Sequence, residues 1–181
     1  YERNIDLYHV PSTFMGQKLA QGGIDPAKIE HLFYTIDLDQ YPPSDVREDY
    51  IIYYGRLAKE KGILTLLKAM KSLPQARLLL AGEGPQRPEL EAYARENGLE
   101  NVEFLGVKGG EELKKLVAES RFVVVPSEWY DNSPLVIYES ASMGKPVIGA
   151  AIGGISELIG HEQTGLLFEP GNHDELASCM K

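Results

Sequence analysis

Cysteine, long apolar runs and basic residues are all scarce in this sequence. Its single cysteine, Cys179, excludes a disulfide within the chain. Its apolar stretches are much shorter than the roughly 20 residues that a membrane-spanning helix needs. Its 27 acidic residues outnumber the 18 basic ones, and the resulting net charge of −9 argues against nonspecific binding to nucleic acid. We therefore expect a cytoplasmic protein without a membrane span, or a longer protein attached peripherally to a membrane.

Histidine and cysteine, the common ligands of zinc in proteins, are also far apart along the chain. The four histidines are His9, His31, His161 and His173. Structural zinc sites instead draw their ligands from closely spaced pairs. The sequence therefore predicts no metal and no other cofactor.

Short apolar runs alternate with segments of helical periodicity over most of the chain. The 181 residues, 43% hydrophobic and 25% charged, are enough for one α/β domain with a sizeable core. The pattern predicts strands within 50–56, 76–82, 102–106, 121–127, 146–150 and 164–169. Between and after them it predicts helices over 63–73, 88–97, 111–120, 134–143, 155–159 and 174–181. This alternation predicts a doubly wound, Rossmann-like α/β fold, with a parallel sheet covered on both faces.

The opening part of the chain has a different pattern. A strand is predicted within 6–12, a helix over 13–23 that ends at glycine, and another strand within 28–33. Two adjacent prolines in the stretch 36–45 then indicate a linker. We expect residues 1–40 to be the tail of a preceding domain with its linker, and residues 41–181 to be a ligand-binding domain truncated at its C-terminus.

The loops after the predicted strands are the candidate ligand-binding segments, because open parallel sheets bind ligands at the carboxyl ends of their strands. The loop GRLAKEKG offers Gly55 for a close backbone approach, and Arg56 and Lys61 as cations for phosphate. Ordinary solvated loop charges are the alternative interpretation. The loop GEGP has Arg87 where a dinucleotide fingerprint needs its third glycine, which disfavours a nicotinamide-dependent dehydrogenase.

The predicted helix at 135–143 carries a carboxylate among apolar residues. Ser133 is expected as its N-cap, Pro134 at its first position, and Gly144 just after its end. Apolar residues on every side predict that the helix is buried. A buried carboxylate at Glu139 needs a partner, either a structural ion pair or a polar ligand. The N-terminus of this helix also suits a phosphate group.

Six segments in this order resemble the C-terminal, donor-binding domain of the GT-B glycosyltransferases of group 1, also called family four. They are GRLAKEKG, AGEGP, NVEFLG, PSEWYDNSPLVIYESASMGKPVI, GGISELI and TGLLFEPGN. The resemblance covers about residues 45–181, and residues 1–40 resemble the end of the family's N-terminal domain. Each segment is weak alone, but all six in register are specific.

The resemblance implies roles for individual residues. The family has two glutamates separated by seven residues, and Glu139 matches the second, which accepts hydrogen bonds from the ribose. Asp131 stands at the first position, which faces the donor sugar; it is one methylene shorter than glutamate and keeps the charge. Arg56 and Lys61 match the residues that hold the diphosphate of the leaving nucleotide, which places them with Asp131 in the catalytic set.

Backbone groups are implied as further contacts with the nucleotide. Pro134 replaces a glycine of the family and has no N–H, so the backbone donor to phosphate would be Leu135 or a later residue. Gly55 would let the chain approach the ligand closely. The backbone around Gly106 and Val107 would border the base.

The implied function is donor binding in a retaining, metal-independent glycosyltransferase of hexosyltransferase type. The donor would be a nucleotide-diphosphate sugar, and the carbohydrate or lipid-linked acceptor would bind mainly to the N-terminal domain. We expect the present chain to be a monomer without transfer activity of its own. A non-catalytic nucleotide-sugar-binding module and a nucleotide-sugar epimerase of the same fold remain alternatives. Trp129 and Tyr130 would either stack on a sugar or pack their own loop.

Overall fold

A computed structural model describes residues 4–181 and contains a six-stranded parallel sheet. The strands lie in the order β5-β4-β3-β6-β7-β8. Their bounds are β3 Ile51–Tyr54, β4 Leu78–Ala81, β5 Val102–Gly106, β6 Phe122–Val125, β7 Val147–Ala150 and β8 Gly165–Phe168. From the central strand β3 the chain builds outward to β5, then returns to β6 and builds outward to β8. The predicted doubly wound fold is confirmed.

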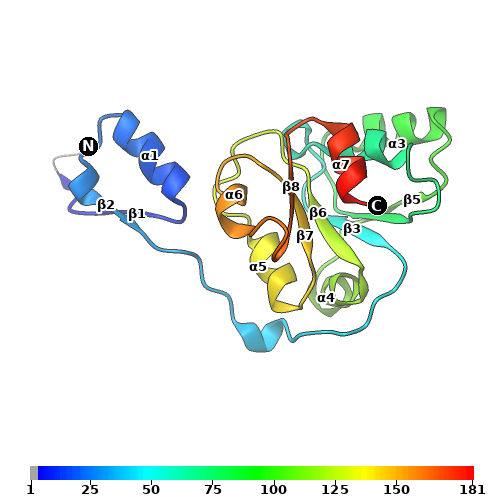
Figure 1. Cartoon of the computed structure of the whole chain (residues 1–181), viewed down its shortest axis with the longest axis horizontal. Coiled ribbons are helices and arrows are strands. Elements are labelled where there is room, and N and C mark those ends of the chain that lie inside the picture. The colour runs from blue at the N-terminus through cyan, green and yellow to red at the C-terminus, as the bar shows by residue number, and fades with distance from the viewer. Residues whose placement is uncertain (1–3) are drawn as a thin grey trace.

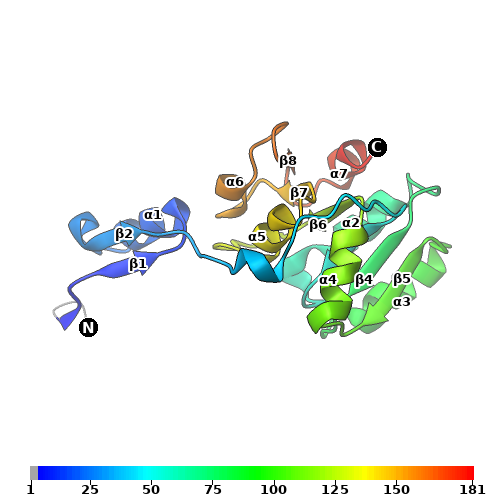
Figure 2. The same ribbon diagram turned by 90° about the horizontal axis from the view of Figure 1, so that it is seen from below.

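Helices cover both faces of this sheet, as Figures 1 and 2 show. One face packs against α2 (Ile63–Met70), α3 (Arg87–Glu96) and α7 (His173–Cys179). The other packs against α4 (Gly110–Glu119), α5 (Leu135–Ser142) and α6 (Ile155–Leu158). Successive side chains of a strand point to opposite faces, so Ile51 and Tyr53 enter the first core while Ile52 and Tyr54 enter the second.

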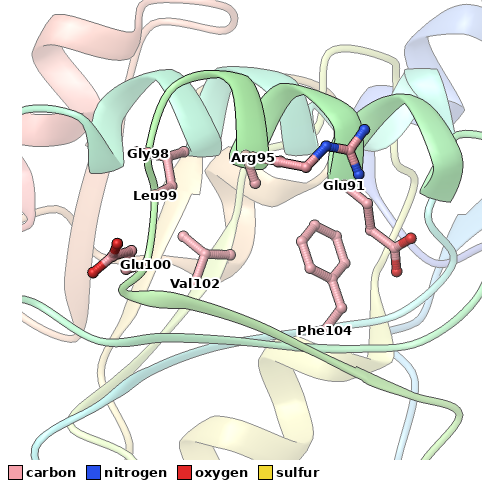
Figure 3. A pocket seen from close by; sticks show the side chains of 8 residues that line it. Glu91, Arg95, Gly98, Leu99, Glu100, Val102 and Phe104 are labelled. Atoms are coloured by element: carbon pink, nitrogen blue, oxygen red, sulfur yellow. The ribbon is translucent and has the colours of Figure 1, made fainter.

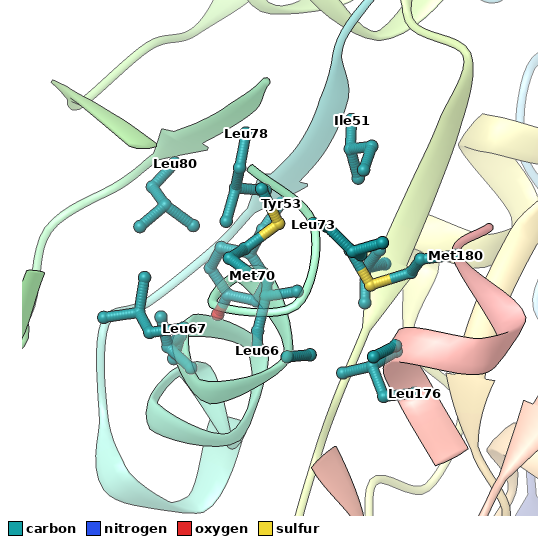
Figure 4. Packing of buried hydrophobic residues seen from close by; sticks show 14 of the residues in the cluster. Ile51, Tyr53, Leu66, Leu67, Met70, Leu73, Leu78, Leu80, Leu176 and Met180 are labelled. Atoms are coloured by element: carbon teal, nitrogen blue, oxygen red, sulfur yellow. The ribbon is translucent and has the colours of Figure 1, made fainter. Parts of the chain in front are cut away.

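Helix α2 lies at the centre of the first core (Figure 4). Leu66, Leu67 and Met70 of this helix are fully buried, as are Leu80 of the sheet and Leu176 of α7. Burying one such side chain stabilises the fold by about 1.5–3 kcal/mol. The buried side chains of α2 therefore anchor this helix between the sheet and α7. The anchored helix in turn fixes the loop that connects β3 to α2.

The N-terminal segments form a small unit beside the large sheet (Figure 1). Strands β1 (Tyr8–Val10) and β2 (Ile29–His31) pair in parallel, and α1 (Thr13–Gln21) connects them. Ser12 is the N-cap of α1, and the helix ends at Gly22. The two strands and the helix predicted from the sequence are therefore confirmed within the described residues.

The predicted linker, 36–45, and the residues just after it are held against the large unit by hydrogen bonds. The hydroxyl of Ser142 donates to the carbonyl of Tyr41 (2.7 Å), and the amine of Lys145 donates to the carbonyl of Val46 (2.5 Å). The backbone N–H of Glu48 donates to the carbonyl of Glu119 (2.7 Å). These contacts place Tyr41 next to α5, although Tyr41 and Ser142 are 101 residues apart in sequence.

Two expectations about α5 are wrong. Pro134, not Ser133, occupies the N-cap position, and the Ser133 hydroxyl lies 2.9 Å from that of Tyr138 instead. The helix is also only partly buried: its interior residues are Ile137 and Ser140, while Leu135 is 48% exposed. The physical reason is that α5 lies at the rim of the sheet, where its first turn borders an open cavity rather than a second layer.

Candidate functional site

A cavity of about 340 Å³ lies where the carboxyl ends of β3 and β6 meet. These strands are neighbours in the sheet, but the chain leaves them in opposite directions, and such a switch point leaves a crevice between the two loops. The cavity is lined by Tyr53, Tyr54, Gly55, Arg56, Lys61, Val123, Val124, Val125, Ser127, Asp131, Pro134, Leu135, Val136 and Glu139.

Hydrogen bonds and a close backbone approach join the two segments that form the crevice. The N–H of Glu128 donates to the carbonyl of Glu60 (2.9 Å), and the hydroxyl of Thr65 donates to the Glu128 carboxylate (2.5 Å). Gly62 lies so close to Pro126 that an added Cβ would be 1.9 Å from the Pro126 carbonyl oxygen. Gly62, the second glycine of GRLAKEKG, is therefore required for the two loops to touch.

Lys61 and Asp131 form an ion pair across the crevice. The Lys61 Nζ lies 2.6 Å from one Asp131 oxygen and 2.9 Å from the other. The hydroxyl of Ser127 donates to the same carboxylate. Both side chains remain about a quarter exposed, so the pair is open to a ligand in the cavity. The arrangement presents a cation, with its position set by a carboxylate.

Arg56 is the second cation at this rim and is held more loosely. Its guanidinium contacts the Glu60 carboxylate one helical turn later, and its side chain is 63% exposed. Its backbone is fixed, because the hydroxyl of buried Tyr53 donates to the Arg56 carbonyl (2.8 Å). Burial, and then the nearby negative charge of Asp131, raise the pKa of Tyr53, which keeps this hydroxyl a donor.

Glu139 lies on the opposite wall and contacts two tyrosines. The hydroxyl of Tyr41 lies 3.1 Å from Oε1, and that of Tyr54 lies 3.1 Å from Oε2. The carboxylate is half-buried rather than fully buried, which corrects the expectation from the sequence. Its partners are hydroxyl groups, whereas the alternative drawn from the sequence was an ion pair.

The loop that carries Asp131 is fixed by the Gly153-Gly154 turn. The N–H of Gly154 donates to the carbonyl of Asp131 (2.8 Å), and an added Cβ on Gly154 would be 1.5 Å from the carbonyl oxygen of Asn132. Packing therefore accounts for this pair of glycines. Tyr130 packs against Phe14 of α1 at 4.9 Å between ring centroids, whereas the neighbouring Trp129 is 67% exposed.

The small N-terminal unit contacts this same loop and α6. The hydroxyl of Ser12 donates to the side chain of Asn132, next to Asp131. The Glu157 carboxylate accepts from the backbone N–H groups of Thr13 (2.8 Å) and Phe14 (2.7 Å) at the start of α1. Burial raises the pKa of Glu157, but these hydrogen bonds outweigh it and leave the pKa below its usual value.

The structure brings together six of the seven residues predicted for the site. Gly55, Arg56, Lys61, Asp131, Leu135 and Glu139 all line the cavity. Val107 does not line it; it follows the edge strand β5 and is 74% exposed. The sequence reasoning missed Tyr54, which ends the strand just before Gly55, a position that could have identified it. It also missed Tyr41, which is 98 residues from its partner Glu139 in the sequence.

A larger cavity, about 540 Å³, lies between α3 and β5 (Figure 3). Its rim carries Glu91, Arg95 and Glu100 around an apolar floor that includes Val102 and Phe104. It lies at the edge of the sheet, away from the switch point where the paired cations and carboxylates converge. We therefore assign the candidate site to the cavity between β3 and β6.

Within residues 4–181 there is neither a cluster of side chains suited to a metal ion nor a helix suited to crossing a membrane. No group of three or more His, Cys, Asp or Glu side chains in this range is arranged to hold a metal ion. No helix in the same described range has the length and apolar character to cross a membrane.

Comparison with known proteins gives a consistent result. Residues 37–181 match the family model described as glycosyl transferases group 1. The sulfoquinovosyl transferase SQD2 of Arabidopsis thaliana is 31% identical over 196 residues, covering 99% of this chain and 38% of that protein. The D-inositol 3-phosphate glycosyltransferase of Mycobacterium sp. (strain KMS) is 32% identical over 167 residues, covering 83% of this chain and 37% of the relative. The chain thus spans less than half the length of these relatives.

Solved structures share the fold. The crystal structure of Anabaena Alr3699/HepE in complex with UDP superimposes with a TM-score of 0.89 at 26% identity, covering 96% of this chain and 52% of that one. The complex of the same protein with UDP-glucose gives a TM-score of 0.86 at 28% identity, with the same coverage.

Proposed function

Because the chain belongs to the group 1 glycosyl transferases, we propose that it is the part of such an enzyme that binds the nucleotide-sugar donor. The donor is a nucleoside-diphosphate sugar, with UDP as the nucleotide, since the Anabaena protein was crystallised with UDP and UDP-glucose. We propose further that the reaction is transfer of a hexose with retention of configuration, without a metal ion or other cofactor.

One observation supports this proposal above the others: Arg56, Lys61, Asp131 and Glu139 line one cavity at the switch point of the sheet. Arg56 and Lys61 lie in the loop after β3, whereas Asp131 and Glu139 lie in the loop and helix after β6, and the two segments are separated by 70 residues or more in sequence. Cations on one wall suit a diphosphate, and a carboxylate on the other suits a pair of vicinal hydroxyls. A nucleoside diphosphate carries both groups.

The chemistry follows from where charge develops. Breaking the bond between the sugar carbon and the phosphate oxygen places negative charge on the leaving diphosphate and positive character on the sugar. Lys61 and Arg56 would stabilise the leaving group, assisted by the first backbone N–H of α5, from Leu135. Asp131 would face the sugar. The two positive charges and the helix N–H would supply the stabilisation that a divalent cation supplies in other enzymes.

The acceptor side of the reaction lies outside the donor cavity. We propose that residues 1–40 end a preceding domain, that residues 41–181 form the donor domain, and that a carbohydrate or lipid-linked acceptor binds mainly to the former. Transfer requires the acceptor oxygen and the sugar within about 3–3.5 Å of each other in an aligned pose. The present chain, a monomer in this proposal and cytoplasmic, would then bind donor but not transfer sugar.

The ion pair between Lys61 and Asp131 supports a second candidate, a nucleotide-sugar-binding module without catalysis. Both Asp131 oxygens already contact Lys61, and one also accepts from Ser127. In this second candidate the carboxylate would act on the position of Lys61 rather than on the sugar. Incubation of UDP-glucose and a pool of acceptors with this chain and, separately, with the full-length protein distinguishes the two candidates. The proposed enzyme requires transfer by the full-length protein alone; no transfer by either supports the module.

Substitution of Glu139 tests the proposed nucleotide site. Glu139→Ala is expected to weaken UDP binding by about tenfold, because it removes hydrogen bonds from hydroxyls to a charged acceptor. The domain should still fold, since the Tyr54 hydroxyl keeps contacts with the Val136 carbonyl (3.0 Å) and Ser140 (3.3 Å). Isothermal titration calorimetry measures the affinity, with the exposed Glu96→Ala as the matched control. Equal affinities for all three proteins would remove Glu139 from the site.

A further inference from the structure

We infer that Tyr54 and Tyr41 are positioning residues that aim the Glu139 carboxylate at the ribose and thereby select ribonucleotides over deoxyribonucleotides. The inference rests on the proposed nucleotide function and deepens it, because it assigns a specificity role to two tyrosines from different parts of the chain. Glu139 has three rotatable side-chain bonds, so a half-buried position alone does not determine where its oxygens point.

Tyr54 fixes one oxygen from within the sheet. Its side chain is buried at 8% exposure, and its hydroxyl lies 3.1 Å from Glu139 Oε2 and 3.0 Å from the Val136 carbonyl. The Ser140 hydroxyl also donates to that carbonyl, at the shorter distance of 2.6 Å. The single proton of Tyr54 is therefore available for the carboxylate, which is the stronger acceptor because it is charged.

Tyr41 fixes the other oxygen from the linker. Its hydroxyl donates to Glu139 Oε1 (3.1 Å), and the hydroxyl of Ser142 holds its carbonyl in place (2.7 Å). The amine of Lys114 lies 5.3 Å from the centre of the Tyr41 ring, a distance that favours a cation–π contact. Burial, followed by the charge of Glu139 and its hydrogen bond, raises the pKa of Tyr41, so that its hydroxyl stays protonated as a donor.

The two tyrosines leave the carboxylate with capacity for a ligand. An ionised carboxylate has about four acceptor positions, and Tyr41 and Tyr54 fill one on each oxygen. The same side chain lines the cavity that holds Arg56 and Lys61. One remaining position on each oxygen matches the 2′- and 3′-hydroxyls of a ribose, which are adjacent donors. A carboxylate free to rotate would accept from these hydroxyls less selectively.

Removal of single hydroxyl groups tests this inference. We expect the wild type to bind UDP about tenfold more tightly than 2′-deoxy-UDP, since one hydrogen bond to a charged acceptor is lost. In Tyr54→Phe this preference should fall to about threefold, and in the doubly substituted Tyr54→Phe/Tyr41→Phe to less than about twofold. Calorimetry with both nucleotides gives the ratio, and thermal unfolding confirms that each variant is folded.

Tyr50→Phe is the matched control. Tyr50 lies in the same core as Tyr54, and its hydroxyl donates to the Leu116 carbonyl (2.7 Å) instead of to Glu139. Tyr50→Phe should therefore leave the preference for UDP over 2′-deoxy-UDP unchanged. If Tyr54→Phe does not fold, Tyr41→Phe in the linker carries the test, with an expected ratio of about fivefold.

The possible outcomes separate the inference from the proposed function. A lower preference for UDP over 2′-deoxy-UDP in Tyr54→Phe and Tyr41→Phe, but not in Tyr50→Phe, supports the positioning role. Equal weakening of UDP and 2′-deoxy-UDP would show that the tyrosines only support the structure, and would overturn the inference while leaving the nucleotide site in place. Absence of UDP binding by the wild type would overturn both.

Discussion

Lys61→Ala is expected to weaken UDP binding by about a hundredfold, more than the loss of one ordinary charged hydrogen bond. The substitution removes the proposed phosphate ligand and also leaves Asp131 without its partner at 2.6 Å. An uncompensated carboxylate would then face the diphosphate and repel it. Uridine carries no phosphate, so its affinity should change by less than about twofold.

The other cations in the same loop provide graded controls for Lys61. Arg56→Ala should weaken UDP binding by about tenfold, because its guanidinium is well exposed and paired with Glu60. Lys59→Ala should have little effect, since Lys59 is an exposed residue that does not line the cavity. Calorimetry with UDP and uridine on all three variants measures the differences. Equal losses for UDP and uridine with Lys61→Ala would contradict its assignment to the phosphates.

Asp131→Asn distinguishes two possible roles of Asp131 in the ion pair: holding the Lys61 amine in position and offsetting its positive charge. The amide keeps the shape of the side chain but loses the charge that holds the Lys61 amine at 2.6 and 2.9 Å, so UDP affinity should fall by about tenfold. Unchanged or higher UDP affinity would show instead that Asp131 only offsets the positive charge of Lys61. Calorimetric titration with UDP therefore measures the contribution of each partner of the Lys61–Asp131 pair.

Gly62→Ala is expected to cause a large loss of stability, because both the backbone conformation and the surroundings of Gly62 disfavour a methyl group. Gly62 has a φ of 66°, which disfavours residues with a Cβ, and its Cβ would lie 1.9 Å from the Pro126 carbonyl oxygen. Backbone strain and overpacking together should lower the free energy of unfolding by about 2–4 kcal/mol. Urea unfolding followed by circular dichroism measures this change.

Gly98→Ala isolates the contribution of the close approach. Gly98 has nearly the same φ, 64°, but no described atom lies within 4 Å of an added Cβ. Only the backbone cost applies there, so we expect a loss of about 1 kcal/mol. The difference between the two variants measures how strongly the loops after β3 and β6 are pressed together. Equal losses would show that the Gly62–Pro126 contact relaxes without cost.

The periodicity of the sequence was sufficient to predict the fold. A short apolar run predicted β3 and helical spacing of apolar residues predicted α2, because hydrophobic burial depends on which residues share a face. The rule that ligands bind at the carboxyl ends of parallel strands then placed Arg56, Lys61, Asp131 and Glu139 near one another. That rule needs only that the strands are parallel, which the alternation of strands and helices implies.

The pairings within the cavity were decided only by the tertiary structure. Lys61 and Asp131 are 70 residues apart, and Tyr41 and Glu139 are 98 apart. No local sequence pattern encodes pairings between residues so far apart, since the sequence specifies which side chains are polar but not which polar groups meet. Which ones meet depends on loop paths and on close approaches, such as that of Gly62 to Pro126, that packing of the whole sheet determines. The sequence alone thus determined the strands, the helices and the rim of the site, and the folded chain determined which charges on that rim are paired and which hydroxyls hold Glu139.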